Sequence, residues 1–288
     1  MEIVNLAAYK FVSIPDPNSW RPRVKARCQE LGVMGSILFS PEGINLFVAG
    51  ERTAIDAFLH FLRTDELFGG RFADIIVKES VSETQPHKRI VVRLKSEIIT
   101  MKHPMLVQPT DERAPAVEPA QLKRWLDQGH DDEGRELLLL DTRNEFEVNI
   151  GTFEEAIHFK IEKFSEFPKA FDDTKPTINE DLQNKTVVSF CTGGIRCEKA
   201  ALFLKERNVP NVFQLDGGIL RYFEEIGGAH WNGECFVFDR RVALDPALNP
   251  TQKEYEITAK QSRMEQYYRW KAKKESEAGA NSSQSTVS

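Results

Sequence analysis

The stretch that decides the fold is Thr186-Val-Val-Ser-Phe-Cys191-Thr-Gly-Gly-Ile-Arg196-Cys197-Glu-Lys-Ala200. Residues 186–191 form a short, mostly apolar and β-branched run, which is typical of a strand buried on both faces of a sheet. Two glycines then break the run, and a helix is expected over residues 198–208. A strand, a Gly-rich turn and a helix in this order indicate one unit of a parallel α/β sheet, whose ligands bind at the carboxyl ends of its strands.

The same alternation continues on both sides of this stretch. Further strands are expected over 136–141, 156–159 and 212–215, and further helices over 119–128 and after Asp216-Gly217-Gly218. Buried strands that alternate with helices favour a doubly wound parallel sheet, which we assign to residues 118–230.

The N-terminal part has a different order of elements. Its patterns predict strands over 3–14, 35–39, 44–48, 72–77 and 89–94, and helices over 19–31 and 53–63. The order β-α-β-β-α-β with one added strand is the ferredoxin-like pattern. We therefore expect a ferredoxin-like α/β domain over residues 1–100.

The remaining segments show no clear periodicity of apolar residues. Residues 101–117 are proline-rich and read as a linker, although an ordered strap packed on a neighbouring domain remains an alternative. A C-terminal extension is expected over 231–275, with a strand over 234–239 and a charged helix over 251–274. The small, polar residues 276–288 are expected to be a disordered tail.

Composition excludes several classes of protein. The chain has 288 residues, 41% of them hydrophobic, and a formal net charge of −6, so no global cationic field indicates a nucleic-acid binder. RNA binding would depend on local patches, and two basic groups are candidates: Arg21, Arg23, Lys25 and Arg27, and His87, Lys88, Arg89, Arg93 and Lys95.

The expected location is the cytoplasm. No run of residues approaches the length of a membrane span, and the N-terminus does not resemble a signal peptide. The 4 cysteines are too few for a disulfide framework. The six histidines show no ligand spacing with the cysteines, so no metal site is predicted, and no flavin or haem motif is evident.

The loop after the central strand suits sulfur chemistry. Backbone N–H groups around Gly193 and Gly194 can face one point at a helix N-terminus and attract an anion. This positive potential and Arg196 should depress the pKa of the Cys191 thiol and favour a nucleophilic thiolate. Cysteine phosphatases place five residues between Cys and Arg, whereas only four separate Cys191 from Arg196.

This shorter loop resembles that of rhodaneses, whose cysteine carries a persulfide. Asp141-Thr-Arg143 resembles the rhodanese Asp-x-Arg motif, and Leu215-Asp-Gly-Gly-Ile219 resembles the Gly-Gly turn after a later strand. Over residues 1–250 the chain further resembles the oxygen-dependent tRNA uridine hydroxylase family. That resemblance rests on four motifs: 191–199 with its Cys-Thr-Gly-Gly-Ile-Arg-Cys core, Ser-Pro-Glu-Gly-Ile-Asn at 40–45, Gly-Thr-Phe at 151–153, and Gly-Glu-Cys-Phe-Val-Phe-Asp at 233–239.

The family resemblance implies a fold and a function. It implies an acylphosphatase-like N-terminal domain, a central rhodanese domain and the formation of 5-hydroxyuridine at the wobble uridine of tRNA, with molecular oxygen as co-substrate. Cys191 would be the catalytic residue, and Thr192, Gly193, Gly194, Ile195 and Arg196 the loop that binds an anion or persulfide. Many members have further C-terminal cysteines, but none follows Cys235 here, so no metal site is carried over. No obligate protein partner is evident.

Several assignments stay open from the residues alone. Cys197 is a candidate resolving thiol for Cys191, but a packed helix cysteine is the simpler interpretation. Asp141 and Arg143 are expected to support the loops structurally. Arg196 is expected to face the anion. A sulfurtransferase that carries sulfane sulfur on Cys191, and a binding module on a rhodanese scaffold, are the alternative functions.

Overall fold

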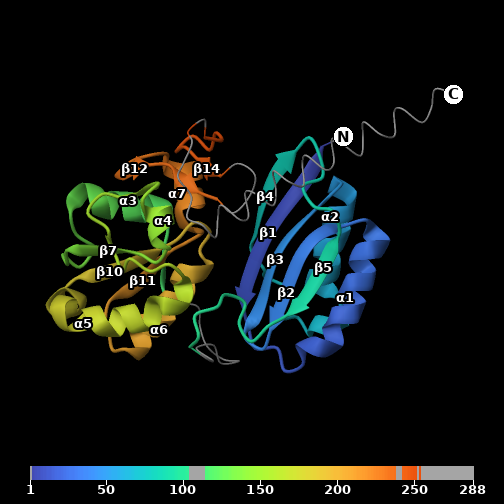
Figure 1. Ribbon diagram of the computed structural model, residues 1–288, viewed down its shortest axis with the longest axis horizontal. Helices are drawn as coiled ribbons and strands as arrows, with labels where there is room; N and C mark the ends of the chain where they lie inside the picture. The colour runs from blue at the N-terminus through green and yellow to red at the C-terminus, as the bar shows by residue number, and fades with distance from the viewer. Residues whose placement is uncertain (1, 104–113, 238–241, 252, 254–288) are drawn as a thin grey trace.

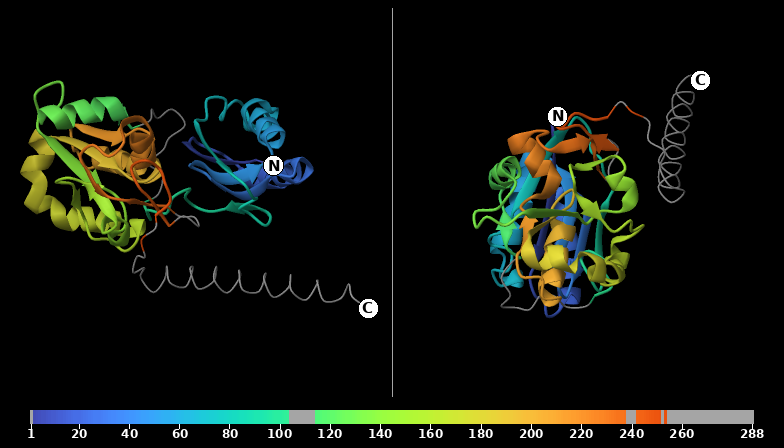
Figure 2. Two further views of the ribbon diagram at one scale, coloured as in Figure 1. Left: turned by 90° about the horizontal axis from the view of Figure 1, so that it is seen from above. Right: turned by 90° about the vertical axis from the view of Figure 1, so that its left-hand side faces the viewer.

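The computed structural model describes residues 2–103, 114–237, 242–251 and 253 (Figure 1). Two five-stranded sheets, each with its own helices, lie side by side (Figure 2). None of the described helices combines the length and the apolar character that a membrane span requires.

The first sheet is ferredoxin-like, as predicted. Its elements are β1 (Ile3–Phe11), α1 (Pro17–Leu31), β2 (Met34–Ser40), β3 (Gly43–Gly50), α2 (Arg52–Thr64), η1 (Glu66–Phe68), β4 (Val77–Ser82) and β5 (Ile90–Leu94). The strand order is β4-β1-β3-β2-β5, and only the β2–β5 pair is parallel. Helices α1 and α2 cover one face of this N-terminal sheet (Figure 1).

The strand predicted over 72–77 is wrong. Residues 70–75 form successive turns in which the Ile75 N–H donates to the Phe72 carbonyl, and β4 begins only at Val77. Phe72 and Ile75 are both buried, and the Phe72 ring lies 5.8 Å from the Trp20 ring. Their spacing of three residues is a turn spacing, whereas a strand would send them to opposite faces.

The second sheet is fully parallel, with helices on both faces. The elements of this part of the chain are β6 (Ala116–Val117), α3 (Pro119–Gln128), β7 (Leu137–Asp141), α4 (Glu145–Val148), β8 (Gly151–Phe153), β9 (Ile157–His158), η2 (Phe164–Glu166), α5 (Phe167–Asn184), β10 (Thr186–Phe190), α6 (Ile195–Glu206), β11 (Val212–Leu215) and α7 (Gly218–Ile226), of which β8 lies outside the parallel sheet. The strand order is β6-β11-β10-β7-β9. Val187 packs with α5 and α6, and its neighbour Val188 packs with α3 and α7, so β10 is buried on both faces.

Two helices differ from the sequence expectation. Helix α6 begins at Ile195, three residues before the predicted start, because Gly194 adopts a φ of 103° and ends the loop there. Cys197 therefore lies in the first turn of α6. The 18-residue helix α5 has no counterpart among the expected helices, because Pro176 lies inside it and interrupts its pattern. It makes the crossover that the parallel strands β7 and β10 require.

The connecting segments are ordered where they are described. Met101 and Ala114 are buried in the core beneath α5 and α6, and β6 forms an edge of the second sheet, so both described ends of the segment 101–117 are packed, while residues 104–113 lie outside the described part of the chain. The strand expected over 234–239 is only β13 (Cys235–Phe236), which pairs with β14 (Ala243–Leu244), while β12 (Trp231–Gly233) pairs with β8. The predicted tail and most of the charged C-terminal helix lie outside the described residues.

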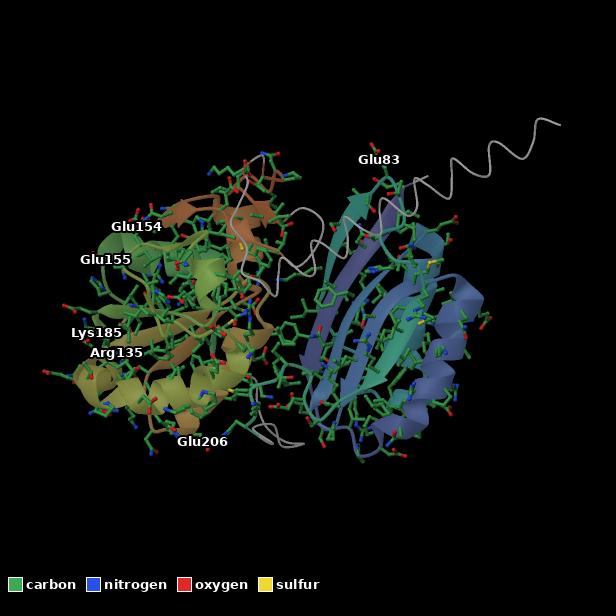
Figure 3. All side chains as sticks on the ribbon, in the orientation of Figure 1. Glu83, Arg135, Glu154, Glu155, Lys185 and Glu206 are labelled. Atoms are coloured by element: carbon green, nitrogen blue, oxygen red, sulfur yellow. The ribbon has the colours of Figure 1, made fainter. Side chains whose placement is uncertain are left out.

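One buried lysine joins the two sheets. The fully buried Lys199 ammonium of α6 lies 2.9 Å from a Glu42 carboxylate oxygen and 2.7 Å from a Glu97 oxygen. By contrast, Lys185, which is paired with Glu136 at 3.1 Å, lies on the side of the second sheet away from the first sheet (Figure 3). Burial raises the pKa of Glu42, although Lys199 opposes that rise.

We expect Lys199→Met to lower the free energy of unfolding by about 3–5 kcal/mol, because it leaves two buried carboxylates without their cation. Urea denaturation at neutral pH measures this loss. Lys205→Met removes an exposed lysine from the same helix and should change the stability little. Equal stabilities of the two variants would contradict the expectation.

Candidate active site

The loop after β10 surrounds the Cys191 sulfur with polar groups. Cys191 follows the buried end of β10, and its side chain is 1% exposed. The Gly194 N–H donates a hydrogen bond of 3.1 Å to the Cys191 Sγ. Thr192 also faces inward, where its hydroxyl donates to the Phe236 carbonyl at 3.4 Å. The loop therefore presents the Gly194 N–H to the sulfur.

The Gly217-Gly218 turn at the start of α7 packs against this loop and binds its carbonyls. The N–H groups of Ile219 and Leu220, in the first turn of α7, donate to the carbonyls of Cys191 and Thr192 at 2.9 and 3.2 Å. Gly218 has a φ of 69°, and a Cβ at this position would lie 2.4 Å from the Cys191 carbonyl oxygen. Gly218 can lie this close to the Cys191 carbonyl only because glycine has no side chain. The start of α7 thus binds the loop carbonyls.

The Arg196 guanidinium is paired with a carboxylate of the protein. It makes two hydrogen bonds, of 2.6 and 2.7 Å, with the carboxylate of Glu147 in α4. Both side chains are buried. A buried guanidinium needs a partner carboxylate, and Glu147 supplies it. The guanidinium also lies 3.5 Å from the Thr192 hydroxyl of the loop, and its role toward a bound anion stays a prediction. Arg196 acts on Cys191 through its charge.

Electrostatics favour a Cys191 thiolate. Burial alone raises the pKa of this thiol, but the Cys197 hydrogen bond, the Arg196 charge and the Gly194 N–H together lower the pKa to about 5. By contrast, burial raises the pKa of Cys28 and of Cys235 to about 12. Cys191 is thus the cysteine that is ionised at neutral pH in this arrangement.

Cys197 lies beside the thiolate and keeps its proton. The two sulfurs are 3.8 Å apart, and the Cys197 Sγ is 3.1 Å from the Gly194 carbonyl oxygen. Burial, followed by the neighbouring Cys191, raises the pKa of Cys197. A protonated thiol at this distance donates to Cys191 and is also within reach of a disulfide after a small movement.

Asp141 and Arg143 form a buried pair at the end of β7. Their side chains are 2.6 Å apart, and the Arg143 guanidinium also donates to the Gly151 carbonyl at 2.6 Å. The Thr152 hydroxyl donates to Asp141 at 2.8 Å. The pair therefore ties β7 to β8, which is the supporting arrangement expected from the sequence. Thr142 adds a hydrogen bond of 2.8 Å to the Phe190 carbonyl and holds the ends of β7 and β10 together.

The N-terminal sheet supplies residues that the sequence did not reveal. Lys78 of β4 donates to the Gly193 carbonyl at 3.2 Å and to the Gly217 carbonyl. Burial lowers the pKa of Lys78, and the charges of Cys191 and Cys197 oppose that shift. The Tyr9 hydroxyl donates to Glu198 at 3.0 Å and would lie 2.7 Å from a Cβ at Gly194. Local sequence gives no signal for these contacts, because they form between residues more than one hundred positions apart.

The described residues contain no group of three His, Cys, Asp or Glu side chains that could hold a metal ion. The chemistry that the described site offers is that of a thiolate with an adjacent thiol, two cationic side chains and backbone donors.

We expect Lys78→Met to raise the pKa of Cys191, because it removes a positive charge from the loop. The rate of Cys191 alkylation by iodoacetamide, followed by peptide mass spectrometry from pH 4 to pH 10, should rise near pH 5 in the original protein and at higher pH in the variant. Lys123→Met removes the same charge from α3, on a side chain paired with Asp127, and should leave the profile in place. Identical profiles for Lys78→Met and the original protein would refute the effect.

Comparison with known families agrees with this architecture. The family described as the UPF0176 acylphosphatase-like domain matches residues 3–98, and the rhodanese-like domain matches residues 118–225. Among solved structures, a homologue of single-domain rhodanese from Saccharomyces cerevisiae is similar to 41% of this chain and 87% of its own, at 19% identity and a TM-score of 0.35.

Curated relatives match across both regions. A protein of Burkholderia lata named tRNA uridine(34) hydroxylase is 60% identical over 88% of this chain and 87% of its own length. A protein of the same name from Burkholderia ambifaria is 59% identical over the same shares. The order of the two domains and the identity across most of the chain lead to one assignment: the chain belongs to the tRNA uridine(34) hydroxylase family.

Proposed function

We propose that this protein hydroxylates uridine 34 of tRNA to 5-hydroxyuridine, with molecular oxygen as co-substrate and Cys191 as the catalytic residue. The observation that carries the proposal is a thiolate-favouring loop at the carboxyl end of β10, in a chain 60% identical to a protein named for this activity. A tRNA substrate and a thiol that must stay reduced suit the cytoplasm, which is the location we propose.

The loop residues have separate roles in this proposal. Gly193 and Gly194 let the backbone face the Cys191 sulfur, and Thr192 and Ile195 complete the turn into α6. Arg196 supplies positive charge, which stabilises a thiolate or a persulfide at the same position. The target uridine must leave the base stack to approach such a site, as bases do in other enzymes that modify them.

The electron balance gives Cys197 a role. Hydroxylation places one atom of O₂ on C5 of uridine and reduces the other atom to water, which takes two electrons. Oxidation of the Cys191 thiolate and the Cys197 thiol to a disulfide provides both electrons and one proton of the water, and solvent provides the other proton. The sum is uridine, O₂, one thiolate, one thiol and one proton giving 5-hydroxyuridine, water and one disulfide. A Sγ–Sγ distance of 3.8 Å supports this pairing.

We expect Cys191→Ser to abolish 5-hydroxyuridine in tRNA. The measurement is mass spectrometry of nucleosides from a bacterial host that lacks its own uridine-34 hydroxylases and expresses either the original chain or the variant. Cys28→Ala removes a buried cysteine from α1, outside the loop, and should retain the modification. Normal 5-hydroxyuridine with Cys191→Ser would end the proposal.

We expect Cys197→Ser to prevent disulfide formation while it keeps a hydrogen-bond donor near Cys191. With tRNA and O₂ but no added thiol, the original chain should form about one product per chain and one Cys191–Cys197 disulfide, which peptide mapping detects. The variant should form no such product in this single turnover. Product from the original chain with both thiols still free would show that the electrons come from elsewhere.

The same thiolate suits a second chemistry, the transfer of sulfane sulfur from thiosulfate. The rhodanese-like match over residues 118–225 favours testing it. Rapid turnover of thiosulfate with cyanide as acceptor, together with unchanged tRNA nucleosides, would assign the loop to sulfur transfer instead.

A further inference from the structure

We infer that the face of the N-terminal sheet opposite α1 and α2 binds single-stranded RNA, and that Phe47 stacks on a base next to the target uridine. This inference rests on the proposed function, because it assigns the place where the substrate tRNA is held. The face is turned toward the second sheet (Figure 1), and Lys78 at its edge contacts the loop that holds Cys191.

Strand alternation places Phe47 on this face. Its neighbours Leu46 and Val48 are buried in the core beneath the two helices, so the Phe47 side chain projects from the other side of β3. The Phe47 side chain is 56% exposed, which is unusual for a ring at the centre of a five-stranded sheet. Nothing in the packing of the N-terminal core requires an aromatic residue at this position.

The strand register connects Phe47 to the active-site loop. Phe47 pairs with Ala7 of β1, and Ala7 pairs with Lys78 of β4, so the three residues form one row on one face. Adjacent strands are about 4.8 Å apart, which puts the backbones of Phe47 and Lys78 roughly 10 Å apart. The Lys78 ammonium binds the Gly193 carbonyl. A base stacked on Phe47 would therefore lie close to the loop that holds Cys191.

A second row gives the face its polarity. Tyr9 pairs with Asn45, Asn45 pairs with Leu38, and Leu38 pairs with Arg93 at the other edge. At one end of this row Tyr9 contacts Glu198 of α6, and at the other end the Arg93 side chain is exposed. The face thus extends from Tyr9, which contacts the second sheet's helix α6, to the exposed Phe47 ring and the exposed Arg93 guanidinium.

These features fit one class of partner, the single-stranded loop of a tRNA. Bases that are unpaired stack on aromatic side chains of open sheets, and nearby arginines contact phosphates. A chain with a net charge of −6 needs such a local surface to bind a polyanion. The basic group at His87, Lys88, Arg89, Arg93 and Lys95, singled out from the sequence, contributes Arg93 to this face.

The test compares variants of exposed residues on the two faces of the same sheet. Phe47→Ala removes the ring, and Phe47→Trp retains a stacking surface. Val81→Ala is the matched control: Val81 is 57% exposed but pairs with Val4, which lies on the helix-covered face. The readouts are fluorescence anisotropy with a labelled anticodon stem-loop RNA, the KM for tRNA, and Cys191 alkylation as a check that the loop is intact.

Phe47→Ala should weaken RNA binding and raise the KM about tenfold, in line with the loss of one stacked base, while Cys191 alkylation stays normal. Phe47→Trp and Val81→Ala should bind like the original chain. Equal RNA binding by Phe47→Ala and Val81→Ala would overturn the inference and leave the proposed function intact. A dimer of the original chain that Phe47→Ala dissociates, with RNA binding unchanged, would assign the face to a second copy and also overturn it.

The two proposals fail in different ways. If the original chain makes no 5-hydroxyuridine, the proposed function fails, whereas RNA binding still reports on the sheet face. If the original chain modifies tRNA but Phe47→Ala does so with an unchanged KM, only the binding surface is refuted.

Discussion

A negative charge on a buried sulfur is the constraint on which the rest of the site depends. Burial opposes ionisation of Cys191, so the surrounding groups must outweigh the lost hydration. The Gly194 N–H and the Cys197 thiol reach the sulfur directly, and Arg196 acts at longer range. Arg196 in turn needs Glu147, because an unpaired buried guanidinium would be costly. The charge of Cys191 thus accounts for Arg196, and the charge of Arg196 accounts for Glu147.

The same reasoning extends to the N-terminal sheet. Lys78 adds a positive charge at the loop carbonyls, and Lys199 with its two carboxylates fixes α6 against the sheet. Breaking a buried ion network of this kind costs several kcal/mol, which holds the two parts in one arrangement. The rhodanese-like fold supplies the sulfur, and the acylphosphatase-like fold supplies part of its electrostatic environment. The site is therefore a property of the whole described chain.

Local pattern predicted the elements whose periodicity is strong. The buried runs of β7 and β10 and the amphipathic α2 were found close to their bounds, and the shared carboxyl end of the parallel strands placed Cys191 correctly. Pattern failed where proline interrupted α5 and where turn spacing around Phe72 imitated a strand. It also could not reveal Glu147 or Lys78, because their partners are distant in sequence. The pairing of the Arg196 guanidinium with Glu147 is one of these contacts.

The 1% exposure of Cys191 has a consequence for catalysis. A nucleobase cannot contact a sulfur that is covered to this extent, and Lys78 and Tyr9 are among the groups that contact the loop and the start of α6. A movement that uncovered the sulfur and also withdrew the Lys78 ammonium from the Gly193 carbonyl would remove a positive charge from the loop. The thiolate would lose one stabilising charge as the base arrives, and its nucleophilicity would rise at that moment, since nucleophilicity increases with thiol basicity. Such a movement would thus couple substrate access to sulfur reactivity.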